Sequence, residues 1–257
     1  MTTFKYTIIF LIGIGLTGLP AFSSEKNKKI SMNKSEKADF VVLELFTSQG
    51  CSSCPSADKL LAKTYEEAQK HHKQLFVLAY HVDYWDRLGW KDPFSQSLFT
   101  KRQYEYAKVF GLQGVYTPQV VVNGAKEFTG SNAQKLNSAL ESGTNLKAKI
   151  DISLEEVKWQ NSQVSFDYNL KGDFKSSELQ VAILSKKEET NIPRGENSGL
   201  KLSGSNVVRV LRTIKASEKS TFSVALPKDL TKENTRIVVF VQDIKSSQVL
   251  GVEGFDF

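Results

Sequence analysis

Apolar residues in the first half of the chain alternate between short continuous runs and stretches where they recur every three or four positions. The run from Val41 to Phe46 is typical of a strand buried on both faces, and the spacing of Ala57, Leu60 and Leu61 is typical of a helix. These patterns predict a strand at 41–46, a helix that begins at the cysteines, a strand at 74–81, a helix at 95–110, a hairpin within 114–130 and a helix at 131–140.

The first strand, helix and second strand are spaced as a right-handed crossover, which gives a parallel pair. The turn after the first strand holds Cys51, and the second strand ends at His81. Both residues are therefore expected at the carboxyl edge of the sheet, where ligands and chemistry are found in open α/β sheets.

From Leu146 onward apolar and polar residues alternate, which is typical of strands. Seven such segments run to the C-terminus, and so many short strands favour a β-sandwich with one core. The expected strands are 148–154, 164–170, 179–185, 207–216, 221–226, 237–243 and 249–253.

The segment between the third and fourth of these strands, Lys186–Ser205, is predicted to be a loop that is long and polar for a hairpin connection. It contains Asn191, Arg194, Glu196 and Asn197. Loops of this length are more often functional than short ones. It either leans over the cysteine edge, binds a partner, or is simply solvated.

The start of the chain has the pattern of a secretory signal peptide over residues 1–23, with Lys5 before an apolar stretch and small residues after it. A membrane anchor is the alternative, but the apolar stretch is shorter than the ~20 residues of a spanning helix. Residues 24–38 are polar and predict a disordered leader. Two domains are expected at 39–144 and 146–257, in an exported protein that is periplasmic or secreted.

The charge pattern excludes one class of partner. The 257 residues include 34 Lys and Arg, 28 Asp and Glu and three His, for a net charge of +6. Because the basic residues are scattered and form no stripe or motif, we expect no nucleic-acid partner. Three histidines also leave little room for a metal site with several ligands.

Cys51 and Cys54 are the only cysteines, and they lie at the start of the first predicted helix. The unpaired N–H groups there favour negative charge, so a thiolate at Cys51 is expected to be stabilised and reactive. Export to an oxidising compartment favours a disulfide between the two. In the reduced protein Cys51 is expected to be the more exposed and more acidic thiol.

The aromatic and acidic segment Val82–Phe94 is predicted to be a loop beside the cysteines. Its aromatic residues Tyr84, Trp85 and Trp90 either face a substrate or pack the loop onto its own domain. Asp83, or Asp86, is a candidate proton acceptor for the neighbouring histidine or for a thiol.

His81 has three candidate roles. When protonated it would lower the pKa of a nearby cysteine, and when neutral it would act as a base or as a metal ligand. The metal-ligand role corresponds to a Cu(I) site of Cys51, Cys54 and His81, since two thiolates and one imidazole suit that ion. The alternative is a purely structural role, in which His81 forms a hydrogen bond to the loop backbone and holds the loop in place.

The order of elements, with the cysteine pair on the first helix and Thr117-Pro118 at the head of the hairpin, resembles the thioredoxin fold. The resemblance implies an α/β thioredoxin-like domain, followed here by an all-β sandwich-like domain. It implies that Cys51 attacks, that Cys54 resolves, and that a cis-Pro118 after Thr117 lies beside them and helps to bind a substrate. It makes Glu44 a candidate for a buried acid that exchanges a proton with the resolving thiol; the alternative is a sheet residue with a basic partner.

The cysteine motif departs from that of thioredoxins themselves. Gly50 stands where they have an aromatic residue, and Ser52-Ser53 stand where they have Gly-Pro. Because the intervening pair tunes the redox potential in that superfamily, the direction of electron flow stays open.

Over nearly the whole mature chain the sequence looks like a family of exported bacterial proteins, the domain-of-unknown-function family numbered twelve twenty-three. The segments that carry this likeness are ELFTSQGCSSCPSAD, YHVDYWDRLGWKDPF, RQYEYA, VYTPQVVVNG and RGENSGLKLSGSNVVR. The likeness implies a fold and almost no assigned activity.

Two functions from different classes follow. The first is a thiol–disulfide oxidoreductase that acts on exported protein thiols or on a redox partner, with the disulfide as its only redox group. The second is a binding module in which the disulfide only staples the start of a helix. Cu(I) handling through the two cysteines and the histidine is a third alternative.

Overall fold

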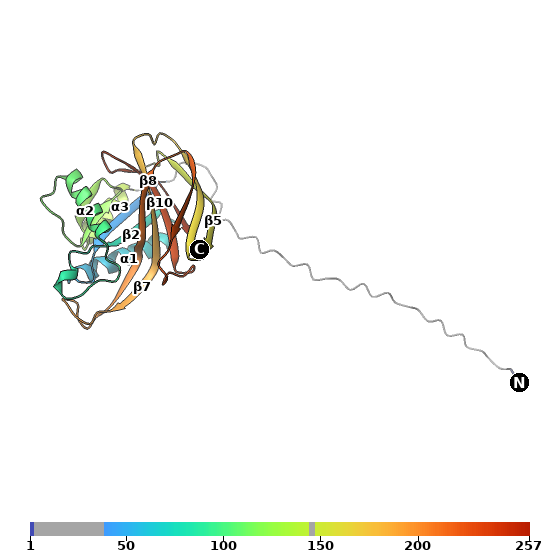
Figure 1. Cartoon of the computed structure of the whole chain (residues 1–257), viewed down its shortest axis with the longest axis horizontal. Helices are drawn as coiled ribbons and strands as arrows, with labels where there is room; N and C mark the ends of the chain where they lie inside the picture. The colour runs from blue at the N-terminus through green and yellow to red at the C-terminus, as the bar shows by residue number, and fades with distance from the viewer. Residues whose placement is uncertain (3–38, 144–146) are drawn as a thin grey trace. The chain divides into compact units, whose positions relative to one another are not determined.

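The computed structural model describes residues 1–2, 39–143 and 147–257 (Figure 1). The predicted signal peptide beyond its first two residues, the leader at 24–38 and the boundary between the predicted domains lie outside the described residues. The N-terminal elements are β1 Val41–Thr47, α1 Cys54–Lys70, β2 Leu75–His81, the short 3-10 helix η1 Asp86–Leu88, α2 Ser97–Phe110, β3 Gln119–Val122, β4 Lys126–Thr129 and α3 Ala133–Gly143. The C-terminal elements are β5 Asp151–Gln160, β6 Gln163–Lys171, β7 Ser177–Asn191, β8 Lys201–Lys215, β9 Lys219–Ala225, β10 Thr235–Asp243 and β11 Val249–Asp256.

Local sequence explains the ends of these elements. Helix α2 ends at Gly111, whose φ of 67° is a conformation that glycine adopts without strain. The β3–β4 hairpin turns through residues 123–125, between the paired Val122 and Lys126. Asn123 and Gly124 have positive φ, a conformation that Asn and Gly adopt more readily than other residues. Pro55 lies in the first turn of α1, where no N–H is needed.

Eight strands form one sheet in the order β11-β10-β7-β8-β2-β1-β3-β4. Strands β1 and β2 are parallel, as predicted, and β3 pairs antiparallel with β1. The two halves of the chain meet where Ala79 of β2 pairs with Val207 of β8. The seven predicted C-terminal strands are present, but four of them extend the N-terminal sheet and only β5, β6 and β9 form a second sheet. The protein is therefore a mixed α/β structure with large sheets.

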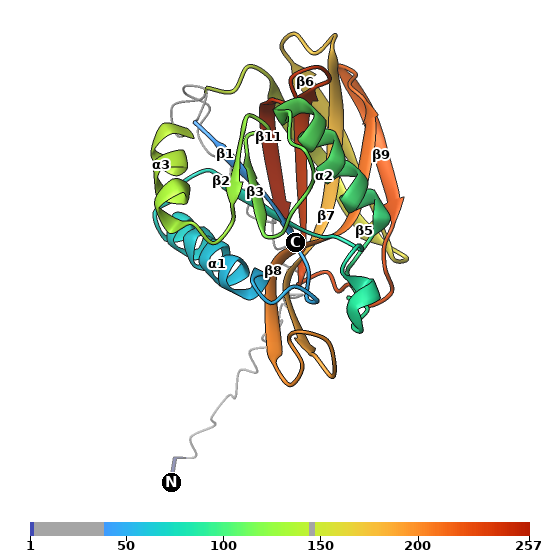
Figure 2. The same cartoon turned by 90° about the vertical axis from the view of Figure 1, so that its left-hand side faces the viewer.

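Both faces of the eight-stranded sheet are covered (Figure 2). Alternate β1 residues contact different helices: Leu43 packs with α1 and α3, whereas Phe46 packs with α2. Strand β7 behaves in the same way, because Val181 faces the three-stranded sheet and Ala182 faces the α2 side. Residues buried on both faces of β7 explain why this strand lies inside a large sheet and not at an edge.

The prediction of a loop over the whole of 186–205 is wrong. Strand β7 continues to Asn191 and β8 begins at Lys201, so the connection is only residues 192–200. The two strands pair with each other up to Asn191 and Lys201, where alternate side chains are exposed. This part of the hairpin is held by hydrogen bonds between backbone groups. Because it buries few apolar side chains, the sequence shows no alternation of apolar and polar residues there. Within the part of the chain described here, no helix is long and apolar enough to cross a membrane.

Candidate functional site

The predicted disulfide between Cys51 and Cys54 is present, at the first turn of α1. The Cα atoms are 5.4 Å apart, and the Cys54 N–H donates to the carbonyl oxygen of Cys51 at 3.2 Å. Both cysteines are fully buried, at 0% exposure. In this oxidised form neither cysteine is exposed, because other segments cover the disulfide. The expectation that Cys51 is the more exposed thiol concerns the reduced protein and stays a prediction.

The first covering segment is the β7–β8 connection, residues 192–200. The amide nitrogen Nδ2 of Asn197 donates to the carbonyl oxygens of Gln49 at 2.8 Å and Cys51 at 3.0 Å. Glu196 Oε2 accepts the backbone N–H of Ser52 at 2.9 Å. This connection therefore leans over the cysteine edge, which was one of the alternatives for its role.

The second covering segment is the aromatic loop, in which Trp85 bridges the cysteine turn and the proline strand. Its indole N–H donates to Thr117 Oγ1 at 2.8 Å, and a Cβ on Gly50 would lie 3.2 Å from the Trp85 Cβ. The Thr117–Pro118 peptide bond is cis, as predicted. Because Gly50 has no side chain, Trp85 can approach the cysteine turn. Thioredoxins carry an aromatic residue at the position of Gly50.

The other two aromatic residues of the loop differ in direction. Trp90 donates its indole N–H to Gln49 Oε1 at 3.1 Å, so it too contacts the segment just before the cysteines. Tyr84 points toward α2 instead, where its hydroxyl donates to Gln103 Oε1 at 3.3 Å. Trp85 and Trp90 flank the disulfide turn, whereas Tyr84 packs the loop onto its own fold.

His81 ends β2 and pairs with Asp92, a partner that the sequence did not indicate. His81 Nδ1 lies 2.6 Å from Asp92 Oδ2, and both side chains are buried. Burial tends to lower the pKa of His81, but the charge and hydrogen bond of Asp92 outweigh it and the pKa is raised. Burial tends to raise the pKa of Asp92, and the charge and hydrogen bonds of His81 and two backbone N–H groups lower it overall. Both shifts favour the charged forms, so the pair favours a protonated His81 beside an ionised Asp92.

Neither Asp83 nor Asp86 is the partner of His81. Asp83 accepts the hydroxyl of Thr100 at 2.6 Å and so ties the loop to α2. Asp86 accepts the hydroxyl of Ser95 at 2.7 Å. Asp92 instead also accepts the backbone N–H of Gln49 at 2.8 Å, which connects the histidine pair to the cysteine turn.

Asp58 is a second acid that sequence reasoning missed. It lies four residues after Cys54 on α1, so the two side chains share one helix face. Thr47 Oγ1, at the end of β1, donates to Asp58 Oδ2 at 3.2 Å. Burial raises the pKa of Asp58 to about 6, although the charge of His81 and the Thr47 hydrogen bond act in the other direction. The i, i+4 spacing from Cys54 was a signal that could have identified it.

Glu44 does not occupy the role of the buried acid behind the disulfide. It projects to the α2 side of the sheet, opposite α1, and forms a bidentate pair with Arg102 at 2.6 and 3.0 Å. The hydroxyl of Tyr106 also donates to Glu44, and Arg102 donates to Gln242 Oε1 at 3.1 Å. The sequence alternative, a sheet residue with a basic partner, is the one that the structure shows. This network connects β1, α2 and β10.

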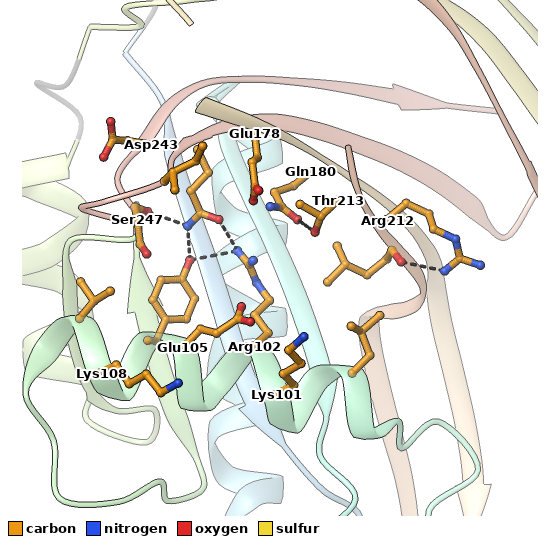
Figure 3. A pocket seen from close by; sticks show the side chains of 16 residues that line it. Lys101, Arg102, Glu105, Lys108, Glu178, Gln180, Arg212, Thr213, Asp243 and Ser247 are labelled. Carbon is orange, nitrogen blue, oxygen red and sulfur yellow. Dashed lines mark hydrogen bonds between the residues drawn. The ribbon is translucent and has the colours of Figure 1, made fainter. Parts of the chain in front are cut away.

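A pocket of about 650 Å³ lies above this network, between α2 and the ends of β7, β8 and β10 (Figure 3). Charges of both signs line it, among them Lys101, Glu105 and Asp243. The polar groups at the floor of the pocket already have hydrogen-bond partners, because Arg102 donates to Gln242 Oε1. Among the described residues, the buried side-chain atoms without a partner are the Tyr80 hydroxyl and Asn123 Nδ2, and neither residue lines this pocket. The pocket therefore indicates no particular ligand.

The copper alternative gains no support from the arrangement of side chains. Over residues 39–143 and 147–257, no three His, Cys, Asp or Glu side chains converge as metal ligands. One imidazole nitrogen of His81 is engaged by Asp92.

Comparison with known proteins gives a family and a fold. The family model described as "Protein of unknown function (DUF1223)" matches residues 42–242. The crystal structure of protein AGR_C_4864 from Agrobacterium tumefaciens is similar, with 26% identity, a TM-score of 0.64 and coverage of 86% of this chain and 96% of that one. HBP35 of Porphyromonas gingivalis is similar at 16% identity and a TM-score of 0.54, covering 87% of this chain and 77% of that one, which concerns the fold alone. No curated protein shows a significant match.

Proposed function

The chain belongs to the DUF1223 family of proteins of unknown function, and we propose that it is an exported thiol–disulfide oxidoreductase with a thioredoxin-like N-terminal part. The observation that carries the proposal is the Cys51–Cys54 disulfide at the start of α1, with Asp58 one turn further along the same helix. A dithiol at a helix start is activated by unpaired N–H groups, and a nearby acid of raised pKa suits proton transfer.

The strand arrangement supports the thioredoxin-like interpretation. Strands β2-β1-β3-β4 form one half of the large sheet, with β1 and β2 parallel and β3 and β4 an antiparallel hairpin. The cis-Pro118 directly precedes β3, and Trp85 links Thr117 to the cysteine turn. In this view the all-β half, which packs β5, β6 and β9 over β7 and β10, is the sandwich-like addition.

The exchange proceeds in two steps. In the reduced protein the Cys51 thiolate attacks one sulfur of a substrate disulfide, which forms a mixed disulfide and releases the other sulfur as a thiolate that takes up a proton. The Cys54 thiolate then attacks Cys51 Sγ, so the internal disulfide forms and the second substrate thiolate leaves. The same steps in reverse transfer the disulfide to a substrate dithiol. When the protein reduces substrates, an exported dithiol partner reduces its disulfide again. When it oxidises substrates, an exported disulfide partner oxidises its dithiol again.

Asp58 gives the resolving step a proton acceptor. Cys54 must lose its proton before it attacks, and Asp58 shares its helix face. With a pKa of about 6, Asp58 is mostly ionised at pH 7 and is still basic enough to accept a proton. The buried pair of His81 and Asp92 places further charge close by, since both act electrostatically on Asp58.

A binding module with a structural disulfide is the second candidate. The observation in its favour is the complete burial of both cysteines. In that case the disulfide fastens the start of α1, and the surface around it serves only for recognition.

Turnover separates the two candidates. The purified mature protein should accelerate the reduction of insulin by dithiothreitol, or the refolding of a scrambled disulfide protein, and Cys51→Ser should abolish the effect. Cys54→Ser should trap mixed disulfides with substrate, because the resolving thiol is missing. Wild-type protein that gives no acceleration in either assay would support the binding module.

A further inference from the structure

We propose that residues 192–200, hereafter the cap, occupy the place of the substrate over Cys51 and must swing away before thiol–disulfide exchange can occur. The inference rests on the proposed function, because it concerns access to the same disulfide. It makes opening of the cap, and not thiol chemistry alone, the step that limits reaction.

The cap is anchored by polar contacts to the backbone of the cysteine turn. Asn197 is buried, at 4% exposure, and Nδ2 is shared by two carbonyl oxygens, those of Gln49 and Cys51. Glu196 accepts the N–H of Ser52, and its hydrogen bonds with Ser52 lower its pKa. These are backbone groups at the reactive turn, where an incoming chain would otherwise find hydrogen-bonding partners.

The cap also packs on the aromatic loop, so the disulfide is enclosed from two sides. A Cβ on Gly195 would lie 3.2 Å from the Cβ of Trp90, and Gly195 has φ of +86°. Gln49 joins the two sides, because its side chain accepts the Trp90 indole N–H at 3.1 Å and donates to Thr190 Oγ1 of β7 at 2.9 Å. Both cysteines are at 0% exposure, so the disulfide is covered while these contacts persist.

The construction of the hairpin is suited to such movement. Strands β7 and β8 hold the cap at the end of a long hairpin, and Figure 2 shows that end projecting beyond the remainder of the sheet. The cap is joined to the cysteine turn by a few hydrogen bonds, each of modest net strength because water replaces it on opening. Opening therefore need not disturb the main cores of the protein.

The test measures how fast the oxidised mature protein is reduced by dithiothreitol, with quenching by alkylation and detection by mass spectrometry. Asn197→Asp keeps the shape of the side chain but replaces the donor with a carboxylate that faces two carbonyl oxygens. We expect reduction to be roughly tenfold faster than in wild type, because two hydrogen bonds are lost. Glu196→Gln, at an exposed position, should accelerate reduction about threefold. Glu189→Gln is the matched control, since Glu189 pairs with Lys201 on the same hairpin outside the cap.

Unchanged reduction rates in both Asn197→Asp and Glu196→Gln, with circular dichroism showing folded protein, would overturn the proposal. Equal acceleration in Glu189→Gln would overturn it as well, because the effect would then belong to the hairpin in general. If Asn197→Asp does not fold, Glu196→Gln decides the matter alone. The reduction rate does not depend on catalysis, so faster reduction without insulin reductase activity would support the cap while rejecting the oxidoreductase. Insulin reductase activity of the wild type, together with unchanged reduction rates in both cap variants, would support the oxidoreductase and reject the cap.

Discussion

Replacing Asp58 by asparagine should stabilise the oxidised protein at neutral pH and leave its stability unchanged in acid. Burial raises the pKa of Asp58 from 3.8 to about 6. An acid whose pKa is higher in the folded state binds its proton more tightly there, so its ionisation weakens folding as the pH rises from about 4 to about 6. Each pKa unit corresponds to about 1.4 kcal/mol, which gives about 3 kcal/mol above pH 6. Because the side chain is partly exposed to water, we expect about 2 kcal/mol.

The assay is equilibrium unfolding in guanidinium chloride at several pH values, with the disulfide intact in both proteins. At a pH of about 3.5 the neutral Asp58 and the introduced asparagine are close equivalents, so the two curves should coincide. At a pH of about 7.5 the variant should unfold at higher denaturant, with an unchanged slope. The His81 pair is present in both proteins and largely cancels in the difference. A variant that is less stable at neutral pH, or a difference that does not vary with pH, would refute the reasoning.

The same substitution should impair exchange chemistry. A side-chain amide at this position cannot accept the proton of Cys54, so the resolving step should slow and mixed disulfides should persist longer than in wild type. A gain in stability together with a loss of activity is expected where a residue is retained for chemistry and not for folding.

Three further outcomes follow from the structure. Arg102→Met should cost about 3–5 kcal/mol in urea unfolding, because it leaves the buried carboxylate of Glu44 unpaired, and adding Glu44→Gln should recover part of this loss. Asp92→Asn should destabilise most between a pH of about 4 and about 6.5, where Asp92 is ionised and His81 is protonated. The penalty should shrink as the pH rises through the raised pKa of His81, because the charge of His81 is lost there, and a pH-independent penalty would contradict the ion pair. Gly124→Ala should strongly lower the melting temperature, because its φ is +64° and a Cβ would overlap a backbone carbonyl oxygen of the β10–β11 turn; an unchanged melting temperature would contradict this contact.

Features that depend on neighbouring residues could be predicted from the sequence. Local patterns predicted the strand at Val41–Phe46, the Asn123-Gly124 turn and the position of the two cysteines at a helix start. The family was also identifiable, since its motifs are continuous segments of the chain. The cysteine pair and its position on the sheet edge were therefore predicted without the structure.

Only the tertiary structure decided what surrounds that pair. Asn197 follows Cys51 by 146 positions, and no periodicity connects a side-chain amide to a carbonyl so far away in sequence. The choice of Asp92 over Asp83 as the partner of His81 depended on how an irregular loop folds back. The role of Glu44 stayed open between a buried acid and a sheet residue with a basic partner, because a continuous apolar strand does not reveal which residues point to α1 and which to α2. Hydrophobic patterns report burial, whereas the direction of a buried polar side chain is set by partners that only packing brings together.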